Sequence, residues 1–213
     1  MELSPDSIVY FEIAGFEVSA TLFFTGVVSL VLVIGSWLIT RNLSTGTEIS
    51  RWQSALESIV AAIRGEIEQL TQEDAAPYLP FVGTLFLFIL MSNLIGIIPR
   101  FESPTGSLST TVALALIVFF AVPSFAIRRK GLRAYLRNFI TPSPIMLPFN
   151  IISEISRTMA LAVRLFGNMM SGRMLVAIML SIVPVFVPVA LNMLNLLIAV
   201  IQAYIFAILA MVY

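Results

Sequence analysis

The sequence predicts an all-α, polytopic membrane protein with about five membrane helices plus an amphipathic helix, the last two membrane helices forming a long tilted hairpin. Hydrophobic residues make up 59% of the 213 residues, charged residues only 11%, and the mean hydropathy is +0.99. Soluble domains carry about 25% charged residues. Several apolar stretches reach the roughly 20 residues that a helix needs to cross a bilayer. The basic residues gather in two loops, as in proteins with a fixed membrane orientation.

The apolar stretches divide a single expected membrane domain, 1–213, into consecutive segments. The predicted order is an outer tail over 1–16, a first membrane helix over 17–39, an amphipathic helix over 48–70, a middle helical hairpin over 77–127 and a long hairpin over 148–213. The two helices of the long hairpin, expected at 148–181 and 184–213, would be roughly 50 and 45 Å long. We therefore expect both to be tilted, with prolines at their ends, where proline is tolerated.

The segment 48–70 has apolar residues at alternating spacings of three and four, which is typical of an amphipathic helix. Two interpretations stay open for it. It lies along the membrane surface or against a partner helix, or it is an ordinary surface helix that caps the bundle.

The basic residues predict which side of the membrane each loop occupies. Arginine and lysine occur three times in 40–76 and five times in 128–137, whereas the tail before residue 17 has none and the loop 99–106 has only Arg100. Cytoplasmic loops carry the excess of basic residues. The N-terminus is therefore expected outside and Tyr213 in the cytoplasm. The formal net charge is zero, so nucleic acid is not an expected partner, and the absence of His and Cys argues against a soft metal site, so no metal or cofactor is expected.

The penultimate membrane segment carries ionisable side chains in an apolar setting: Glu154, Arg157, Arg164 and Arg173. Glu154 precedes Arg157 by three residues, so the two are expected to form an ion pair on one helix face. Arg164 has no acidic neighbour at three or four positions, and the last segment contains no acid. A cation inside a membrane segment must face protein or water and find a partner. We therefore expect the anion for Arg164 to belong to another chain.

Helical geometry separates the arginines. Arg157 and Arg164 are seven residues apart and share a face, whereas Arg164 and Arg173 are nine apart and point to roughly opposite faces. Gly167 and Gly172 are expected to let a neighbouring helix approach closely.

Amide side chains occur at four further positions of interest. Asn195 and Gln202 are seven residues apart on one stripe of the last helix; Asn192 lies on the same helix, and Asn93 is a similar case in the second membrane segment. Such amides either bond between helices or line a narrow wet path.

Several motifs together resemble subunit a of the F-type rotary ATP synthase. They are "SNLIGIIP" at 92–99, "SPTGSLSTTVALAL" at 103–116, "ALAVRLFGNMMSG" at 160–172 and "IQAYIFAILAMVY" at 201–213. The resemblance implies a multi-pass, non-catalytic stator subunit of the inner (plasma) membrane, with two offset half-channels for protons or Na⁺ beside the c-subunit ring. It implies that Arg164 is the essential arginine, with Asn168 and Gln202 beside it, and that the amphipathic helix contacts b-type peripheral stalk subunits.

Two positions depart from the pattern of the family. Many members place an acid or His after the glycine that here is Gly172, and a His or Glu where this chain has Asn195; here Arg173 follows the glycine. These departures resemble the N-type branch of the family. With these residues, either the outer half-channel conducts ions through water and amide groups, or the coupling ion is sodium. Arg173 is expected to line or flank that half-channel.

The same residues are also compatible with a different class of protein. A stand-alone secondary transporter or ion channel would use Arg164 to bind an anionic substrate, and it would be expected to show repeats or a helix broken near the midplane. A purely structural scaffold would leave Arg164 unexplained.

The predicted orientation can be tested by labelling, because the chain has no cysteine. Ser7→Cys should react with an impermeant thiol reagent added outside, and Ser44→Cys and Ser143→Cys with the same reagent added from the cytoplasm. Labelling of Ser7→Cys from the cytoplasm alone would reverse the assignment.

Overall fold

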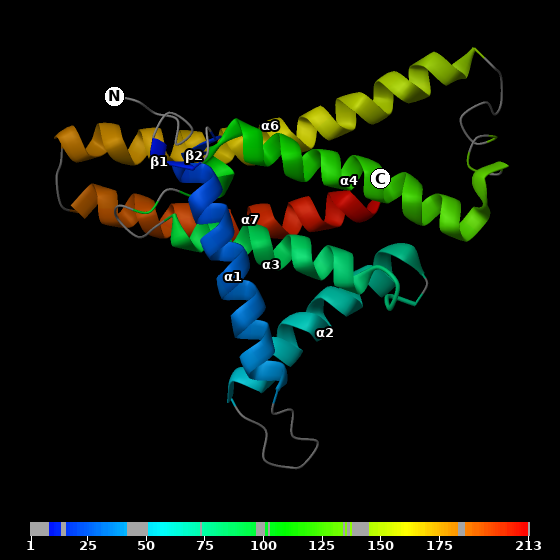
Figure 1. Cartoon of the computed structure of the whole chain (residues 1–213), viewed down its shortest axis with the longest axis horizontal. Helices are drawn as coiled ribbons and strands as arrows, with labels where there is room; N and C mark the ends of the chain where they lie inside the picture. Colours follow the sequence, from blue (N-terminus) through cyan, green and yellow to red (C-terminus); the bar gives the residue numbers. More distant parts are fainter. Residues whose placement is uncertain are drawn as a thin grey trace. The chain divides into compact units, whose positions relative to one another are not determined.

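The computed structural model describes residues 9–13, 16–41, 51–72, 74–96, 101, 103–133, 135, 137, 145–182 and 186–212, which are mainly helical (Figure 1). Among these residues, four helices are long and apolar enough to cross a membrane: α1 (Ala20–Thr40), α4 (Leu108–Lys130), α6 (Met146–Ile182) and α7 (Phe186–Val212). A fifth apolar helix, α3 (Leu79–Ile95), is shorter at 17 residues. The predicted polytopic helical membrane fold is confirmed.

A small β-hairpin precedes the first helix and was not predicted. Strands β1 (Val9–Ile13) and β2 (Phe16–Ser19) pair antiparallel, with Ile13 opposite Phe16. The first membrane helix, predicted over 17–39, therefore starts three residues later than expected, and the outer location of the tail over 1–16 stays a prediction. The Ser19 backbone is extended and its Oγ accepts a hydrogen bond from the Leu22 amide at 3.5 Å, so the helix begins at Ala20.

Helix α2 (Arg51–Thr71) occupies the predicted amphipathic segment and is not among the candidate membrane spans in the described residues. Its apolar face ends in a buried cluster, in which Ile67 packs with Ala75, Val82 and Ala207. Near this cluster, on a solvent-exposed part of α2, Arg64 Nε lies 2.8 Å from Glu68 Oε1. The end of α2 thus packs against α3 and α7. This packing favours the interpretation of α2 as a surface helix that caps the bundle.

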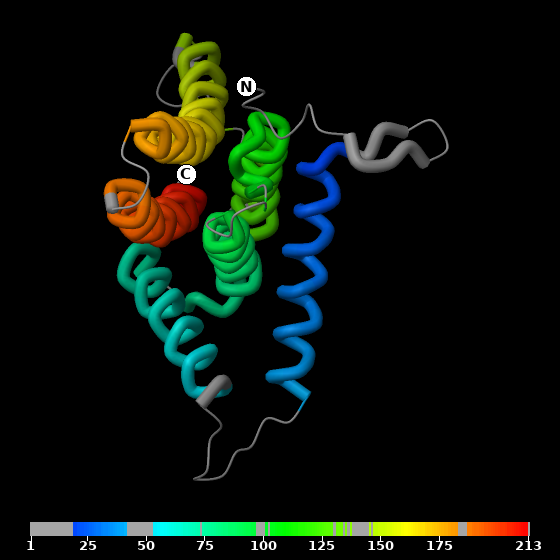
Figure 2. The backbone as a smooth tube through the Cα atoms, turned by 90° about the vertical axis from the view of Figure 1, so that its left-hand side faces the viewer, coloured from blue at the N-terminus to red at the C-terminus, as the bar shows by residue number. Residues whose placement is uncertain are grey.

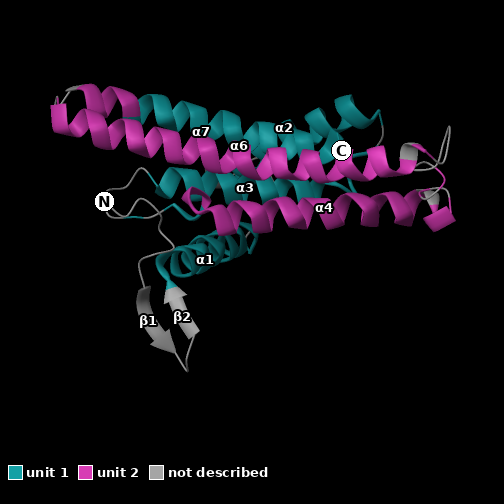
Figure 3. Cartoon of the chain, turned by 90° about the horizontal axis from the view of Figure 1, so that it is seen from above, with its two compact units in different colours: residues 1–104, 192–212 teal, residues 105–191, 213 magenta. Residues whose placement is uncertain are grey.

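The chain forms two compact units (Figure 3). Unit 1 contains residues 1–104 and 192–212, and unit 2 contains residues 105–191 and 213. In unit 1, α3 packs against both α1 and α2 (Figure 2). In unit 2, α4 and α6 pack along each other. A single membrane domain over the whole chain stays a prediction.

The last two helices have nearly the predicted bounds. Helix α6 has 37 residues and α7 has 27, which correspond to about 55 and 40 Å. Pro148 lies in the first turn of α6 and Pro188 in the first turn of α7, where a proline removes no helical hydrogen bond. Helix α6 therefore runs unbroken through all three of its arginines, Arg157, Arg164 and Arg173.

Candidate functional site

Helix α6 packs on α4 through one apolar face and leaves another face open. Leu161, Ala162 and Leu165 on the packed face are at most 5% exposed. Arg164 comes between them in sequence, yet it is exposed, because a rotation of 100° per residue carries it out of the contact. Within unit 2, its side chain therefore lies on a face of α6 that α4 does not cover.

The exposed residues around Arg164 form a continuous line along α6, which we call the Arg164 stripe. Its members are exposed and recur at spacings of three, four or seven; they are Ser153, Arg157, Ala160, Arg164, Ser171, Leu175, Ile178 and Ile182. Half-buried Gly167 and Asn168 lie in the gap between Arg164 and Ser171. The residues on both sides of Arg164 are thus small or polar.

Gly167 has no side chain, so it leaves the backbone of α6 uncovered beside Arg164. A Cβ added at Gly167 would meet no atom within 4 Å, so this glycine is not required by packing inside the described chain. Small residues on a membrane helix let a second helix approach its backbone closely. The predicted close approach at Gly167 is therefore sterically possible on the open face, and Gly172 is half-buried further along the same helix.

Arg157 has the partner that the sequence predicts. Its Nη1 lies 3.9 Å from Glu154 Oε2, and the Glu154 side chain is only 19% exposed. Tyr135, which lies before α6 in the basic segment, is close enough for Glu154 to act on it. Burial and then the negative charge of Glu154 raise the pKa of the Tyr135 hydroxyl above its usual value. The charge of Glu154 thus acts on Arg157 and Tyr135, near one end of α6.

Arg164 differs from Arg157, which is paired with Glu154. Across the described parts of the chain, no carboxylate lies within ion-pair distance of the Arg164 guanidinium. A cation in the middle of an apolar helix costs at least about 3 kcal/mol unless it has a partner or water. The exposed face thus presents a permanent positive charge to whatever lies beside α6.

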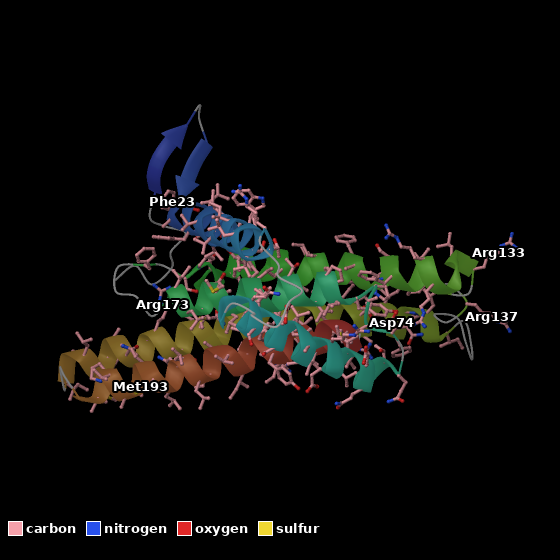
Figure 4. All side chains as sticks on the ribbon, turned by 90° about the horizontal axis from the view of Figure 1, so that it is seen from below. Phe23, Asp74, Arg133, Arg137, Arg173 and Met193 are labelled. Carbon is pink, nitrogen blue, oxygen red and sulfur yellow. The ribbon has the colours of Figure 1, made fainter. Side chains whose placement is uncertain are left out.

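Arg173 lies on a different side of α6, as its spacing from Arg164 predicts. The Arg173 side chain is labelled in Figure 4. Its guanidinium lies beside Gly106, at the end of the short 3₁₀ helix η2 (Pro104–Gly106) just before α4 begins, where an added Cβ would come within 2.7 Å of Nη1. Its side chain is half-buried. Arg164 and Arg173 consequently have separate surroundings and do not share a partner within unit 2.

The amide residues divide between the two units. Asn93 is 2% exposed, and its Nδ2 donates to the Ala199 carbonyl at 3.3 Å, joining α3 to α7 within unit 1. Gln202, three residues after Ala199, is 3% exposed. Asn192 and Asn195 are half-buried on α7, also in unit 1, whereas Asn168 belongs to unit 2 with Arg164. Asn93 therefore bonds between helices, one of the two roles that its sequence position left open.

Sequence reasoning missed a second contact in the same region of unit 1. Ser103 Oγ donates to the Ser92 carbonyl at 2.9 Å, and both residues are at most 1% exposed. A Cβ added at Gly96 would come within 2.7 Å of Ser103 Cβ. The glycine in "SNLIGIIP" was the available signal, because it permits this close approach of the chain to the end of α3.

Comparison with known proteins places the chain among ATP synthase subunits. A family model described as ATP synthase A chain matches residues 22–213. "ATP synthase subunit a 2" of Acaryochloris marina is 57% identical over 213 residues, covering 100% of this chain and 91% of that protein. "ATP synthase subunit a 1" of Crocosphaera subtropica is also 57% identical, with 100% and 93% covered. "ATP synthase subunit a" of Albidiferax ferrireducens is 55% identical, with 100% and 92% covered.

The bond between α3 and α7 predicts a modest role for Asn93 in stability. Asn93→Leu removes the donor to the Ala199 carbonyl, which should lower the free energy of unfolding by about 0.5–1.5 kcal/mol. The thermal midpoint of the purified protein in detergent should then fall by about 2–5 °C. Thr84→Val is the matched control on α3, since exposed Thr84 bonds only to Pro80 of its own helix. Equal midpoints for the two variants would contradict the assignment.

Proposed function

Because the chain belongs to the ATP synthase A chain family, we propose that it is the stator subunit a of an F-type ATP synthase. In this role it provides two offset half-channels for protons or Na⁺, and ion flow is coupled to rotation of the c-subunit ring. The observation that carries the proposal is the exposed Arg164 at the middle of a 37-residue apolar helix. ATP chemistry belongs to other subunits, and this chain is non-catalytic.

The position of Arg164 supports a partner that comes from outside this chain. The residue stands nineteenth in α6, about 27 Å from each end of the helix. Its face is free of α4, and the neighbouring Ala160, Gly167 and Ser171 are small. A rotor helix with a carboxylate at the same membrane depth would fit beside this stripe and supply the opposite charge.

The charge of Arg164 accounts for ion release. A guanidinium stays protonated under all physiological conditions. A carboxylate that passes close to it is favoured in its ionised form, so it gives up its bound proton or sodium ion to the first half-channel. Once rotation has carried the carboxylate past Arg164, the second half-channel reloads it from the other side of the membrane. The fixed cation also repels ions that would cross directly between the half-channels.

The remaining candidate residues have subsidiary roles in this proposal. Asn168, Asn192, Asn195 and Gln202 offer uncharged hydrogen-bonding groups along the path of the ion, and Glu154 acts near one end of α6. The N-terminus faces outward and the C-terminus faces the cytoplasm in the inner (plasma) membrane. Helix α2 contacts b-type peripheral stalk subunits, a role supported by apolar residues that it leaves exposed, which are Ile59, Val60 and Leu70.

A stand-alone transporter has less support. Such a protein would be expected to bind its substrate at a helix broken near the midplane. Helix α6 is continuous from Met146 to Ile182 and carries Arg164 at its centre.

Substitution of Arg164 tests the proposed function. Arg164→Ala should abolish both ATP synthesis and ATP-driven pumping in the reconstituted complex, because the charge that drives ion release is gone. Arg164→Lys should retain only a small fraction, since a compact ammonium lacks the planar fork and loses its proton more easily when desolvated. Pumping would be measured in vesicles with protons and, separately, with sodium ions.

Arg157→Ala is the matched control for this test, because Arg157 shares the Arg164 stripe but has Glu154 as its own partner. It should pump far better than Arg164→Ala. Nearly normal coupled pumping by Arg164→Ala with either ion would overturn the proposal.

A further inference from the structure

Helix α4 ends in a run of basic residues at the depth where lipid headgroups lie. Its apolar span, Leu108–Arg129, has 22 residues, which is about 33 Å of helix and close to the roughly 30 Å thickness of the hydrocarbon layer. The basic residues at this end are Arg128, Arg129, Lys130, Arg133 and Arg137. When α4 crosses the bilayer, this segment therefore lies at the level of the lipid phosphate groups.

The backbone turns directly after α4. Gly131 has a φ of 80°, a conformation that residues with a Cβ rarely adopt, and its amide donates to the Ile127 carbonyl at 2.9 Å. The Tyr135 amide then donates to the Gly131 carbonyl at 3.1 Å, so a new helical turn follows at once. This turn keeps Arg133 and Arg137 near the end of α4.

Tyr135 brings the same turn back to α6. Its side chain is half-buried and lies close enough to Glu154 for the carboxylate to act on its hydroxyl. Figure 4 shows Arg133 and Arg137 pointing outward at this end of unit 2. The basic segment thus lies beside both the end of α4 and the first part of α6, with these arginines facing away from the helices.

The positive charge of this segment has little acid to balance it within unit 2. The exposed arginines are Arg128, Arg129, Arg133 and Arg137. Among the residues that the structure describes, no carboxylate lies within ion-pair distance of Arg128 or Arg133. Glu154 is the only acidic residue in 105–191, and it already pairs with Arg157. The segment therefore presents a net positive charge to its surroundings.

Large apolar side chains are exposed at the same end of unit 2. Leu132, next to Arg133, is 56% exposed, and Phe149, at the start of α6, is 63% exposed. Guanidinium groups bind phosphate oxygens through paired N–H donors. A phospholipid offers a phosphate for the arginines and an acyl chain for the apolar side chains, whereas an acidic soluble segment offers only the charge.

We propose that the basic turn after α4, together with the start of α6, binds the headgroup phosphate of an anionic phospholipid, whose acyl chain covers the exposed apolar side chains. This site goes beyond the proposed stator function and does not depend on it. Lipid binding and ion pumping are therefore separate measurements, and either can fail without the other.

Quenching of a fluorescent label by brominated lipids tests the site in the whole chain. Because the chain contains no cysteine, Ser124→Cys gives a single bimane label at an exposed position of α4, four residues before Arg128. The labelled chain is reconstituted into phosphatidylcholine vesicles that contain brominated phosphatidylglycerol or, at the same mole fraction, brominated phosphatidylcholine. Ser36→Cys is the matched reporter on α1, since Ser36 is also exposed and stands five residues before Arg41.

The anionic lipid should quench the label at Ser124→Cys with an apparent association constant at least roughly fivefold above that of phosphatidylcholine, the factor that one basic residue contributes near an anionic surface. Arg133→Gln combined with Arg137→Gln should lower this preference several-fold, whereas the two lysine substitutions should retain most of it. Arg64→Gln is the charge control and should change nothing, because exposed Arg64 already pairs with Glu68 on α2. The label at Ser36→Cys should show a smaller preference.

Several results would overturn the lipid site. Equal quenching by the two lipids would mean that the segment does not select an anionic headgroup, and an equal preference at Ser36→Cys would mean that the whole chain is attracted to an anionic surface. Relief of quenching by soluble glycerol phosphate would mean that a free phosphate is sufficient. If the paired glutamine substitutions leave the lipid preference unchanged but release an acidic subunit from the assembled complex, the basic turn binds protein instead.

Discussion

The free-energy cost of a permanent cation in the middle of an apolar helix constrains the rest of this molecule. A guanidinium is a permanent cation at physiological pH, and α6 is too long and too apolar for a central side chain such as Arg164 to reach either interface without help. The helix must therefore present Arg164 to a charge or to water that unit 2 does not supply in its described part. The small or polar residues next to Arg164 in the Arg164 stripe, the separate face of α6 that packs on α4, and the unbroken course of α6 all keep Arg164 accessible to such a partner.

Several other polar groups of the membrane segments have partners within the described part of the chain, in contrast to Arg164. Glu154 pairs with Arg157 three residues away, Asn93 reaches the Ala199 carbonyl, and Ser103 reaches the Ser92 carbonyl. Each of these contacts stabilises the chain by itself. Arg164 is placed where the chain would gain nothing from it alone, which is the pattern expected of a group that acts on a passing partner.

Much of the helical frame could be predicted because hydropathy and helical periodicity act locally. The bounds of α6, the Glu154–Arg157 pair and the separation of Arg164 from Arg173 all follow from spacings within one helix. The β-hairpin before Ala20 was missed because two strands of four and five residues give too short a pattern beside a long apolar run. The residues that Asn93 and Arg173 contact could not be predicted, because Ala199 and Gly106 are far away in sequence. Neither alanine nor glycine has a polar side chain that would indicate a contact with a polar residue.

We propose that the Arg164 stripe, and no other face of α6, meets the carboxylate-bearing partner. A cysteine scan of residues 157–175 in the assembled complex, with one cysteine near the carboxylate of the c subunit, measures this directly as cross-linking yield. We expect maxima at Ala160, Gly167 and Ser171 and minima at Leu161 and Leu165, which pack toward α4. Maxima at Leu161 and Leu165, or yields with no helical period, would contradict it.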